Sequence, residues 1–205
     1  MLGNEQLIHH LIAAGVLRTQ SLIDAFKKCD RIFFVPQEYF SYAYEDRPLP
    51  IGKAQTISQP YTVAIMLELL APQIGNRVLD IGSGSGWTTA LLATAVGASG
   101  SVEGIEIVHS LVEYGNNNLA KADIPNASIK LGDATSLGKP GEVYDRILVS
   151  ASATEMPLQL FDQLKPGGIL VIPIQNSIWR FIKQENGSID SYELPGFVFV
   201  PLILS

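Results

Sequence analysis

The strongest structural signal in the chain is Val-Leu-Asp-Ile-Gly-Ser-Gly-Ser-Gly at residues 78–86. A buried strand at 77–81 is expected to run into the three glycines, and a helix at 87–96 to follow them. Glycine lets the backbone approach a ligand closely, and the N-terminus of the following helix presents free N–H groups. One glycine would indicate an ordinary strand-to-helix turn. Three of them favour a ligand-binding loop made of Gly82, Ser83, Gly84, Ser85 and Gly86.

Outward from this loop, apolar strands alternate with helical segments. Strands separated by helices predict an α/β fold, a mostly parallel sheet with helices on both faces. An antiparallel pair at 178–184 and 197–204, joined by a polar segment that contains Asn186-Gly187, is expected to close a seven-stranded sheet. The other predicted strands are 101–107, 127–131, 145–149 and 168–174, and the other predicted helices are 63–70, 110–121 and 157–164.

The first sixty residues have a different pattern, so we divide the single compact unit into a segment 1–60 and a domain 61–205. Apolar residues at helical spacing predict two short helices, the first ended by Gly15 and the second capped by Thr19. Residues 31–60 are rich in proline and are expected to be irregular, but their six aromatic side chains argue against disorder. Irregular segments of this length are usually functional, so segment 1–60 is expected to cover the ligand site.

Composition narrows the class of protein. Of the 205 residues, 47% are hydrophobic and 17% charged, which excludes an intrinsically disordered chain. With 20 acidic against 14 basic residues, no nucleic-acid partner is expected. Cys29 is the only cysteine and the three histidines lack a second cluster of ligands, so no metal site is expected. The sequence shows no signal peptide and no apolar run of membrane-spanning length, so we expect a cytoplasmic monomer without membrane association.

The glycine loop has the spacing G-x-G-x-G, which differs from the G-x-G-x-x-G of dinucleotide-binding enzymes. Two acidic residues after later strands add to this pattern. Glu106, twenty residues beyond Gly86, can accept hydrogen bonds from both hydroxyls of a ribose, or it is a solvated strand end. Asp133, which precedes Ala134 after the third strand, can accept from the exocyclic amine of a purine, or it forms a turn. Three loops at the carboxyl ends of neighbouring strands therefore predict an adenosine site.

This pattern resembles the class I S-adenosylmethionine-dependent methyltransferases and implies their Rossmann-like fold. It also implies S-adenosylmethionine as cofactor and S-adenosylhomocysteine as product. Residues 48–60, Pro-Leu-Pro-Ile-Gly-Lys-Ala-Gln-Thr-Ile-Ser-Gln-Pro, look like the hallmark loop of the protein-L-isoaspartate (D-aspartate) O-methyltransferases. Blocks at 34–36, 43–46, 163–168 and 199–202 also resemble that family, so the resemblance covers about residues 7–203.

The resemblance implies methyl transfer to the free α-carboxylate of L-isoaspartyl residues in damaged proteins and peptides, which starts repair through a succinimide. It also implies that Ser58 is the active-site serine and that Gln55, Thr56, Ile57 and Ser58 contact the cofactor. An ionised carboxylate needs no general base to attack a sulfonium methyl group, so catalysis would rest on positioning. Alternatively, Ser58 is an N-cap of the helix that starts near Pro60.

Three other functions stay open at this point. They are a class I methyltransferase with another substrate, a non-catalytic protein that binds S-adenosylmethionine, and a less favoured NAD-dependent oxidoreductase. The chain departs from the family pattern at Ala54, Trp87, Gln175 and Ile203.

Overall fold

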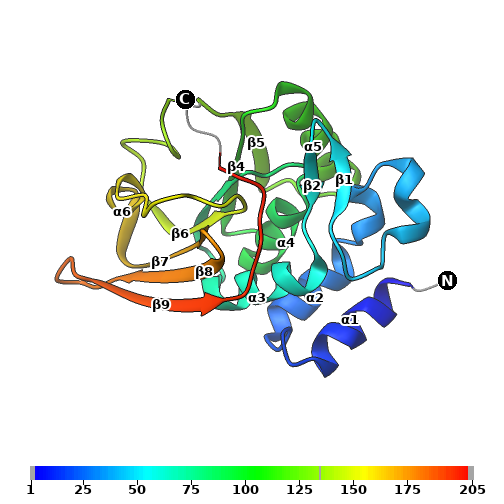
Figure 1. Ribbon diagram of the computed structural model, residues 1–205, viewed down its shortest axis with the longest axis horizontal. Helices are drawn as coiled ribbons and strands as arrows, with labels where there is room; N and C mark the ends of the chain where they lie inside the picture. Colours follow the sequence, from blue (N-terminus) through cyan, green and yellow to red (C-terminus); the bar gives the residue numbers. More distant parts are fainter. Residues whose placement is uncertain (1–2, 134, 203–205) are drawn as a thin grey trace.

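The computed structural model describes residues 3–133 and 135–202, and its centre is a sheet of seven strands (Figure 1). The strands are β3 (Arg77–Ile81), β4 (Ser101–Glu106), β5 (Ala127–Leu131), β6 (Tyr144–Val149), β7 (Leu164–Ile174), β8 (Ser177–Lys183) and β9 (Ile189–Pro195). Their order from edge to edge is β5-β4-β3-β6-β7-β8-β9. The first five pair in parallel, while β8 is antiparallel to both β7 and β9. The predicted α/β sheet is therefore confirmed.

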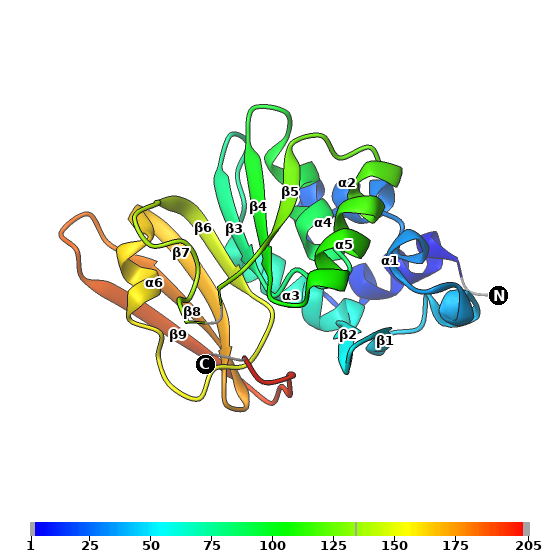
Figure 2. The ribbon, with the colours of Figure 1, turned by 90° about the horizontal axis from the view of Figure 1, so that it is seen from above.

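Alternate residues along the strands face opposite sides of the sheet and build two apolar cores. Leu79 and Ile147 belong to one core, and their neighbours Val78 and Leu148 belong to the other. Figure 2 shows two of the helices, α4 and α5, on one side of the sheet and α6 on the other. The helices that pack on the strands are α3 (Pro60–Leu70), α4 (Trp87–Val96), α5 (His109–Lys121) and α6 (Gln159–Asp162). Among the described helices, none combines the length and apolar character needed to cross a membrane.

Helices α1 (Asn4–Ala13) and α2 (Gln20–Lys28) form the start of the chain, and α2 packs on the outer surface of α4. The rings of Phe26 and Trp87 meet edge to face with their centroids 5.5 Å apart. Thr19 is the N-cap of α2, as predicted, but its side chain does not cap the helix. Instead the carboxylate of Glu68 in α3 accepts hydrogen bonds from the N–H groups of Arg18 and Thr19 at 2.6 and 2.7 Å. This contact joins the N-terminal helices to the domain.

The stretch 31–60 is more regular than predicted. It contains two 3₁₀ helices, η1 (Arg31–Phe34) and η2 (Gln37–Tyr42), and a hairpin of β1 (Leu49–Gly52) and β2 (Gln55–Ile57). The hairpin turn carries Lys53 and Ala54 at φ 55° and 59°, a left-handed conformation that usually selects glycine or asparagine. The sequence therefore lacks the usual turn signal, and the strands are too short for a clear alternation of apolar residues.

The prediction of a final strand at 197–204 is wrong. The last strand is β9, which follows directly after the turn that contains Asn186-Gly187. An edge strand can be polar because one side faces solvent, so β9 carries little of the apolar alternation that marks buried strands. The apolar run instead lies beside the loop after β6, where Ser152 N–H donates to Val200 O and Leu202 N–H donates to Ser152 O, both at 2.8 Å. Residues 203–204 lie outside the described residues.

Candidate active site

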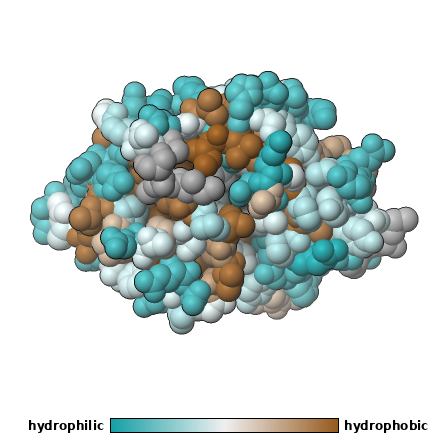
Figure 3. All heavy atoms as spheres, turned by 45° about the horizontal axis from the view of Figure 1, so that its top comes forward, coloured by the Kyte–Doolittle hydropathy of each residue, from teal (hydrophilic) through white to brown (hydrophobic). Residues whose placement is uncertain are grey.

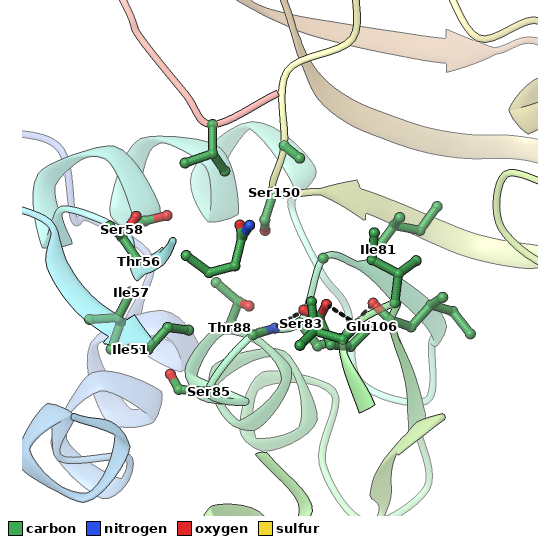
Figure 4. Close-up of a pocket in the computed structure, with 18 of the residues that line it drawn as sticks. Ile51, Thr56, Ile57, Ser58, Ile81, Ser83, Ser85, Thr88, Glu106 and Ser150 are labelled. Atoms are coloured by element: carbon green, nitrogen blue, oxygen red, sulfur yellow. Dashed lines mark hydrogen bonds between the residues drawn. The ribbon is translucent and has the colours of Figure 1, made fainter. Parts of the chain in front are cut away.

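A cleft lies at the carboxyl ends of β3, β4 and β6, the edge where parallel sheets bind ligands. The β1–β2 hairpin forms the opposite wall, and the segment 200–202 contributes a third side. In Figure 4, Ser58, Thr56 and Ile57 lie on one side of the cleft, and Ser83 and Glu106 lie on the other. The predicted residues that line the cleft are Gln55, Thr56, Ile57, Ser58, Gly82, Ser83, Gly84, Ser85 and Glu106.

The glycine loop needs glycine for close packing as well as for its backbone conformation. Gly84 has a φ of 51°, and a Cβ atom there would lie 3.0 Å from Ile51 Cδ1 of the hairpin. Gly86 has a φ of 85°, and a Cβ there would lie 3.1 Å from Gly115 O of α5. Gly86 is the N-cap of α4 and is not among the lining residues. The loop therefore faces the cleft with its first four residues and the helix layer with its last.

Glu106 ends β4 inside the cleft and is only 6% exposed. Its two carboxylate oxygens accept hydrogen bonds from Gly84 N–H and Val108 N–H, each at 2.9 Å (Figure 4 shows the loop contact). These bonds fix the carboxylate and the glycine loop relative to each other. Each carboxylate oxygen can accept more than one hydrogen bond, so both keep capacity for the hydroxyls of a ribose.

Asp80, a residue of β3, lies fully buried next to the glycine loop. Its Oδ2 accepts hydrogen bonds from the hydroxyls of Thr88 and Thr89 at 2.9 and 2.6 Å, whereas Oδ1 has no partner among the described residues. Burial raises the pKa of the Asp80 carboxyl to about 6, although the two threonines favour the charged form. The glycine cradle, the Glu106 carboxylate and this buried acidic group fit a cationic adenosine derivative such as S-adenosylmethionine.

The burial of Asp80 predicts a pH-dependent stability. Because its pKa is raised, the folded protein keeps the proton between about pH 4 and pH 6 while the unfolded chain loses it, so wild-type stability falls as pH rises through this window. The free energy of unfolding of Asp80→Asn, relative to wild type, is therefore expected to rise by about 2 kcal/mol between pH 4 and pH 7. Urea unfolding of both proteins across this range measures the difference. A difference in free energy of unfolding between the two proteins that stays constant with pH would contradict the raised pKa of Asp80.

Ser58 follows β2 directly and lines the cleft. The alternative that Ser58 is the N-cap of α3 is wrong, because the N-cap is Gln59. The free N–H of Tyr61 in the first turn is bound by the carboxylate of Asp46 at 2.8 Å. The helix start therefore does not use the Ser58 hydroxyl.

Asp133 lies on the surface after β5 and is not among the residues that line the cleft. Its Oδ1 accepts hydrogen bonds from the N–H and the hydroxyl of Thr135 at 2.9 and 2.7 Å, the geometry of an aspartate turn. These bonds hold the pKa of the Asp133 carboxyl below its usual range. Gly132 N–H donates to Glu106 O at 2.8 Å, so the turn is tied to the strand end that carries Glu106. Ala134 lies outside the described residues.

The structure adds lining residues that sequence reasoning missed. Ile107 and Val108 follow Glu106 and give the cleft an apolar surface. Their position directly after a candidate ribose-binding residue is the signal that could have identified them. Trp87, which the sequence marks only as a departure from the family pattern, lines the cleft as the first residue of α4. The segment 200–202 had no local signal, because a distant contact with the loop after β6 brings it to the cleft.

Comparison with known proteins agrees with this geometry. Residues 2–204 match the family model described as Protein-L-isoaspartate(D-aspartate) O-methyltransferase. A protein-L-isoaspartate O-methyltransferase of Pyrococcus horikoshii is 43% identical over 204 residues, covering 97% of this chain and 92% of the relative. One of Methanopyrus kandleri is 41% identical and covers 98% of this chain and 91% of the relative.

Solved structures give the same result. A Plasmodium falciparum structure described as a putative protein-L-isoaspartate O-methyltransferase, in complex with S-adenosyl-L-homocysteine, superimposes with a TM-score of 0.87 at 26% identity. The match covers 98% of this chain and 99% of that one. A second protein-L-isoaspartate O-methyltransferase structure gives 0.86 at 30% identity, covering 97% of this chain and 65% of that one. The family model and the relatives span nearly the whole chain, and the chain therefore belongs to the protein-L-isoaspartate(D-aspartate) O-methyltransferase family.

Proposed function

We propose that this protein transfers a methyl group from S-adenosylmethionine to the free α-carboxylate of L-isoaspartyl residues in damaged proteins and peptides. The transfer leaves S-adenosylhomocysteine. The backbone nitrogen then attacks the methyl ester and displaces methanol to give a succinimide, and addition of water to the succinimide can restore normal aspartate. One observation carries the proposal. The block Gln55–Ser58, which resembles the hallmark loop of the family, lines the cleft opposite the glycine loop and Glu106.

The residues of the cleft act by binding and orientation. Gly82–Ser85 and Glu106 hold the adenosine, and Ser58 on the facing wall donates its hydroxyl to the substrate carboxylate. The cofactor supplies an electrophilic methyl group when bound. The substrate carboxylate is already ionised at neutral pH, so no side chain has to remove a proton, and the rate depends on alignment and on exclusion of water.

Other assignments belong to the same proposal. The segment 1–60 covers the active site through its hairpin, and Gln55, Thr56 and Ile57 contact the cofactor. The assignment of Asp133 and Ala134 to the adenine stays a prediction from the sequence. Three exposed apolar side chains lie at the ends of parallel strands or in the loops after them, Ile107 after β4, Leu131 at the end of β5 and Met156 in the loop after β6. Figure 3 shows hydrophobic side chains gathered in the middle of one face, within a mostly hydrophilic periphery. Such a surface suits an extended peptide of mixed sequence.

The partner class follows from the same features. The substrates are isoaspartyl-containing proteins and peptides. The excess of 20 acidic over 14 basic residues disfavours binding to nucleic acid. We place the protein in the cytoplasm as a monomer. Methyl transfer to an isoaspartyl peptide, beside the aspartyl peptide of the same sequence, tests the function and separates it from a non-catalytic binding protein.

Glu106→Ala is expected to weaken S-adenosylmethionine binding by about 10- to 150-fold. The ribose hydroxyls lose a charged acceptor, and such hydrogen bonds contribute about 1.5–3 kcal/mol. The glycine loop also loses the contact from Gly84 N–H. Isothermal titration calorimetry measures the affinity, with Glu113→Ala on the exposed face of α5 as a control. Unchanged affinity would remove Glu106 from the cofactor site.

A further inference from the structure

Among the residues that the structure describes, Arg31, the first residue of η1, is the largest completely buried side chain. Among the described residues no carboxylate lies within 4.0 Å of its guanidinium. Every hydrogen bond that the guanidinium makes there goes to a main-chain carbonyl instead. Nη1 donates to Ala43 O at 2.8 Å and to Glu45 O at 3.2 Å, and Nη2 donates to Arg47 O and Ser58 O, both at 3.0 Å.

These four carbonyls flank the hairpin that forms one wall of the cleft. Ala43, Glu45 and Arg47 precede β1, and Ser58 follows β2, so one guanidinium closes the loop from 43 to 58 at its base. The same group stacks over Trp87, 5.3 Å from the ring centroid. Because Trp87 begins α4 directly after the glycine loop, Arg31 contacts both the wall with Ser58 and the wall with the cofactor loop.

This arrangement is costly for the fold. Burial lowers the pKa of Arg31 to about 9, while the charge of Asp46 acts in the opposite direction. The Nε of Arg31 has no hydrogen-bond partner among the described residues. A buried cation that lacks a paired carboxylate is unfavourable for stability compared with apolar packing of the same volume. Its fourfold contact with carbonyls therefore points to a role in geometry.

We propose that Arg31 is a positioning residue for methyl transfer, which sets the direction of the Ser58 hydroxyl by fixing the Ser58 carbonyl. The carbonyl carbon and Cβ are both bonded to Cα of Ser58, so holding the carbonyl oxygen limits the directions that the side chain can take. Arg31 is not among the residues that line the cleft, and it acts only through Ser58 and the base of the hairpin. The inference rests on the proposed function, in which Ser58 orients the substrate carboxylate.

The test is a double-mutant cycle between Arg31→Lys and Ser58→Ala, because coupled residues give non-additive effects. Lysine keeps the positive charge, but its ammonium group lacks the planar pair of nitrogens with which arginine donates hydrogen bonds to carbonyls on both sides of the hairpin base. Arg31→Lys alone is expected to lower kcat for an isoaspartyl peptide by about 10- to 100-fold, since misalignment of about 1 Å has effects of this size. In the Ser58→Ala background the same change is expected to lower kcat less than about 3-fold. The affinity for S-adenosylhomocysteine, measured by calorimetry, is expected to stay within about 3-fold in all four proteins.

Arg146→Lys is the matched control. Its guanidinium also donates to main-chain carbonyls, those of Ala71 and Asp145, but Arg146 lies in the first half of β6 and does not line the cleft. This variant is expected to lower the Tm and to leave kcat unchanged. All rates are measured below the unfolding transition of each protein. If Arg31→Lys does not fold, Arg31→Gln with saturating S-adenosylhomocysteine during purification takes its place in the cycle.

The outcomes separate the two proposals. An equal loss of kcat from Arg31→Lys in both backgrounds, or no loss in either, overturns the positioning role. A large loss confined to the background with Ser58 supports it. If the wild-type protein binds S-adenosylhomocysteine but methylates no isoaspartyl peptide, the proposed function fails, and the positioning role fails with it. This result differs from an active wild-type protein in which Arg31 and Ser58 show no coupling, which overturns the positioning role alone.

Discussion

An isoaspartyl peptide is expected to be methylated at least about 100 times faster than the aspartyl peptide of the same sequence. In an isoaspartyl residue the main chain passes through the side-chain methylene, so the free carboxylate occupies a different place relative to the backbone. Ile57 is buried and the Ser58 carbonyl is held by Arg31, so the wall that meets the substrate cannot easily adjust. A displacement of about 1 Å is enough for a rate loss of this size in a reaction that depends on alignment.

The measurement uses labelled methyl groups at saturating S-adenosylmethionine, with initial rates for both peptides at several concentrations. The aspartyl peptide is the internal control, because it has the same charge and the same flanking residues. Equal labelling of the two peptides would contradict the proposed specificity. Labelling of neither, with tight cofactor binding, would instead support a non-catalytic binding protein.

Ser58→Ala is expected to lower turnover of the isoaspartyl peptide by about 30- to 150-fold, because one positioned hydrogen bond contributes about 2–3 kcal/mol in the transition state. Cofactor affinity is expected to remain close to wild type, since the glycine loop and Glu106 are untouched. Thermal stability is also expected to change little. The N-cap of α3 is Gln59, and Asp46 already binds the free N–H of Tyr61.

The experiment pairs initial rates with thermal unfolding on the same preparation. Ser101→Ala, at the opposite end of β4 from the cleft and exposed, is the matched control and should change neither quantity. Full activity in Ser58→Ala would reject the role of this hydroxyl. A large loss of Tm with normal turnover in the folded fraction would show that Ser58 stabilises the helix start after all.

Signals within short stretches of sequence were enough to predict the centre of the molecule. An apolar run, three glycines and a helix define β3, the glycine loop and α4 by local backbone preferences. Parallel neighbours bring their carboxyl ends to one edge of a sheet, so Glu106 could be placed beside that loop from strand order alone. Ser58 could be named only through the family resemblance, because a lone serine before Gln59-Pro60 equally fits a helix cap.

Tertiary structure alone decided which segments close the cleft. The apolar run after β9 looks like a strand, but its residues Val200 and Leu202 pair with Ser152 of another loop. The polar residues of β9 form the edge strand because the turn before them places them beside β8, whatever their hydrophobicity. Nothing in the sequence distinguishes Arg31 from a charged residue on the surface. In the structure its guanidinium donates a hydrogen bond to Ser58 O, 27 residues further along the chain. Such contacts depend on which buried carbonyls remain without a donor once the whole chain has folded, and no local pattern carries that information.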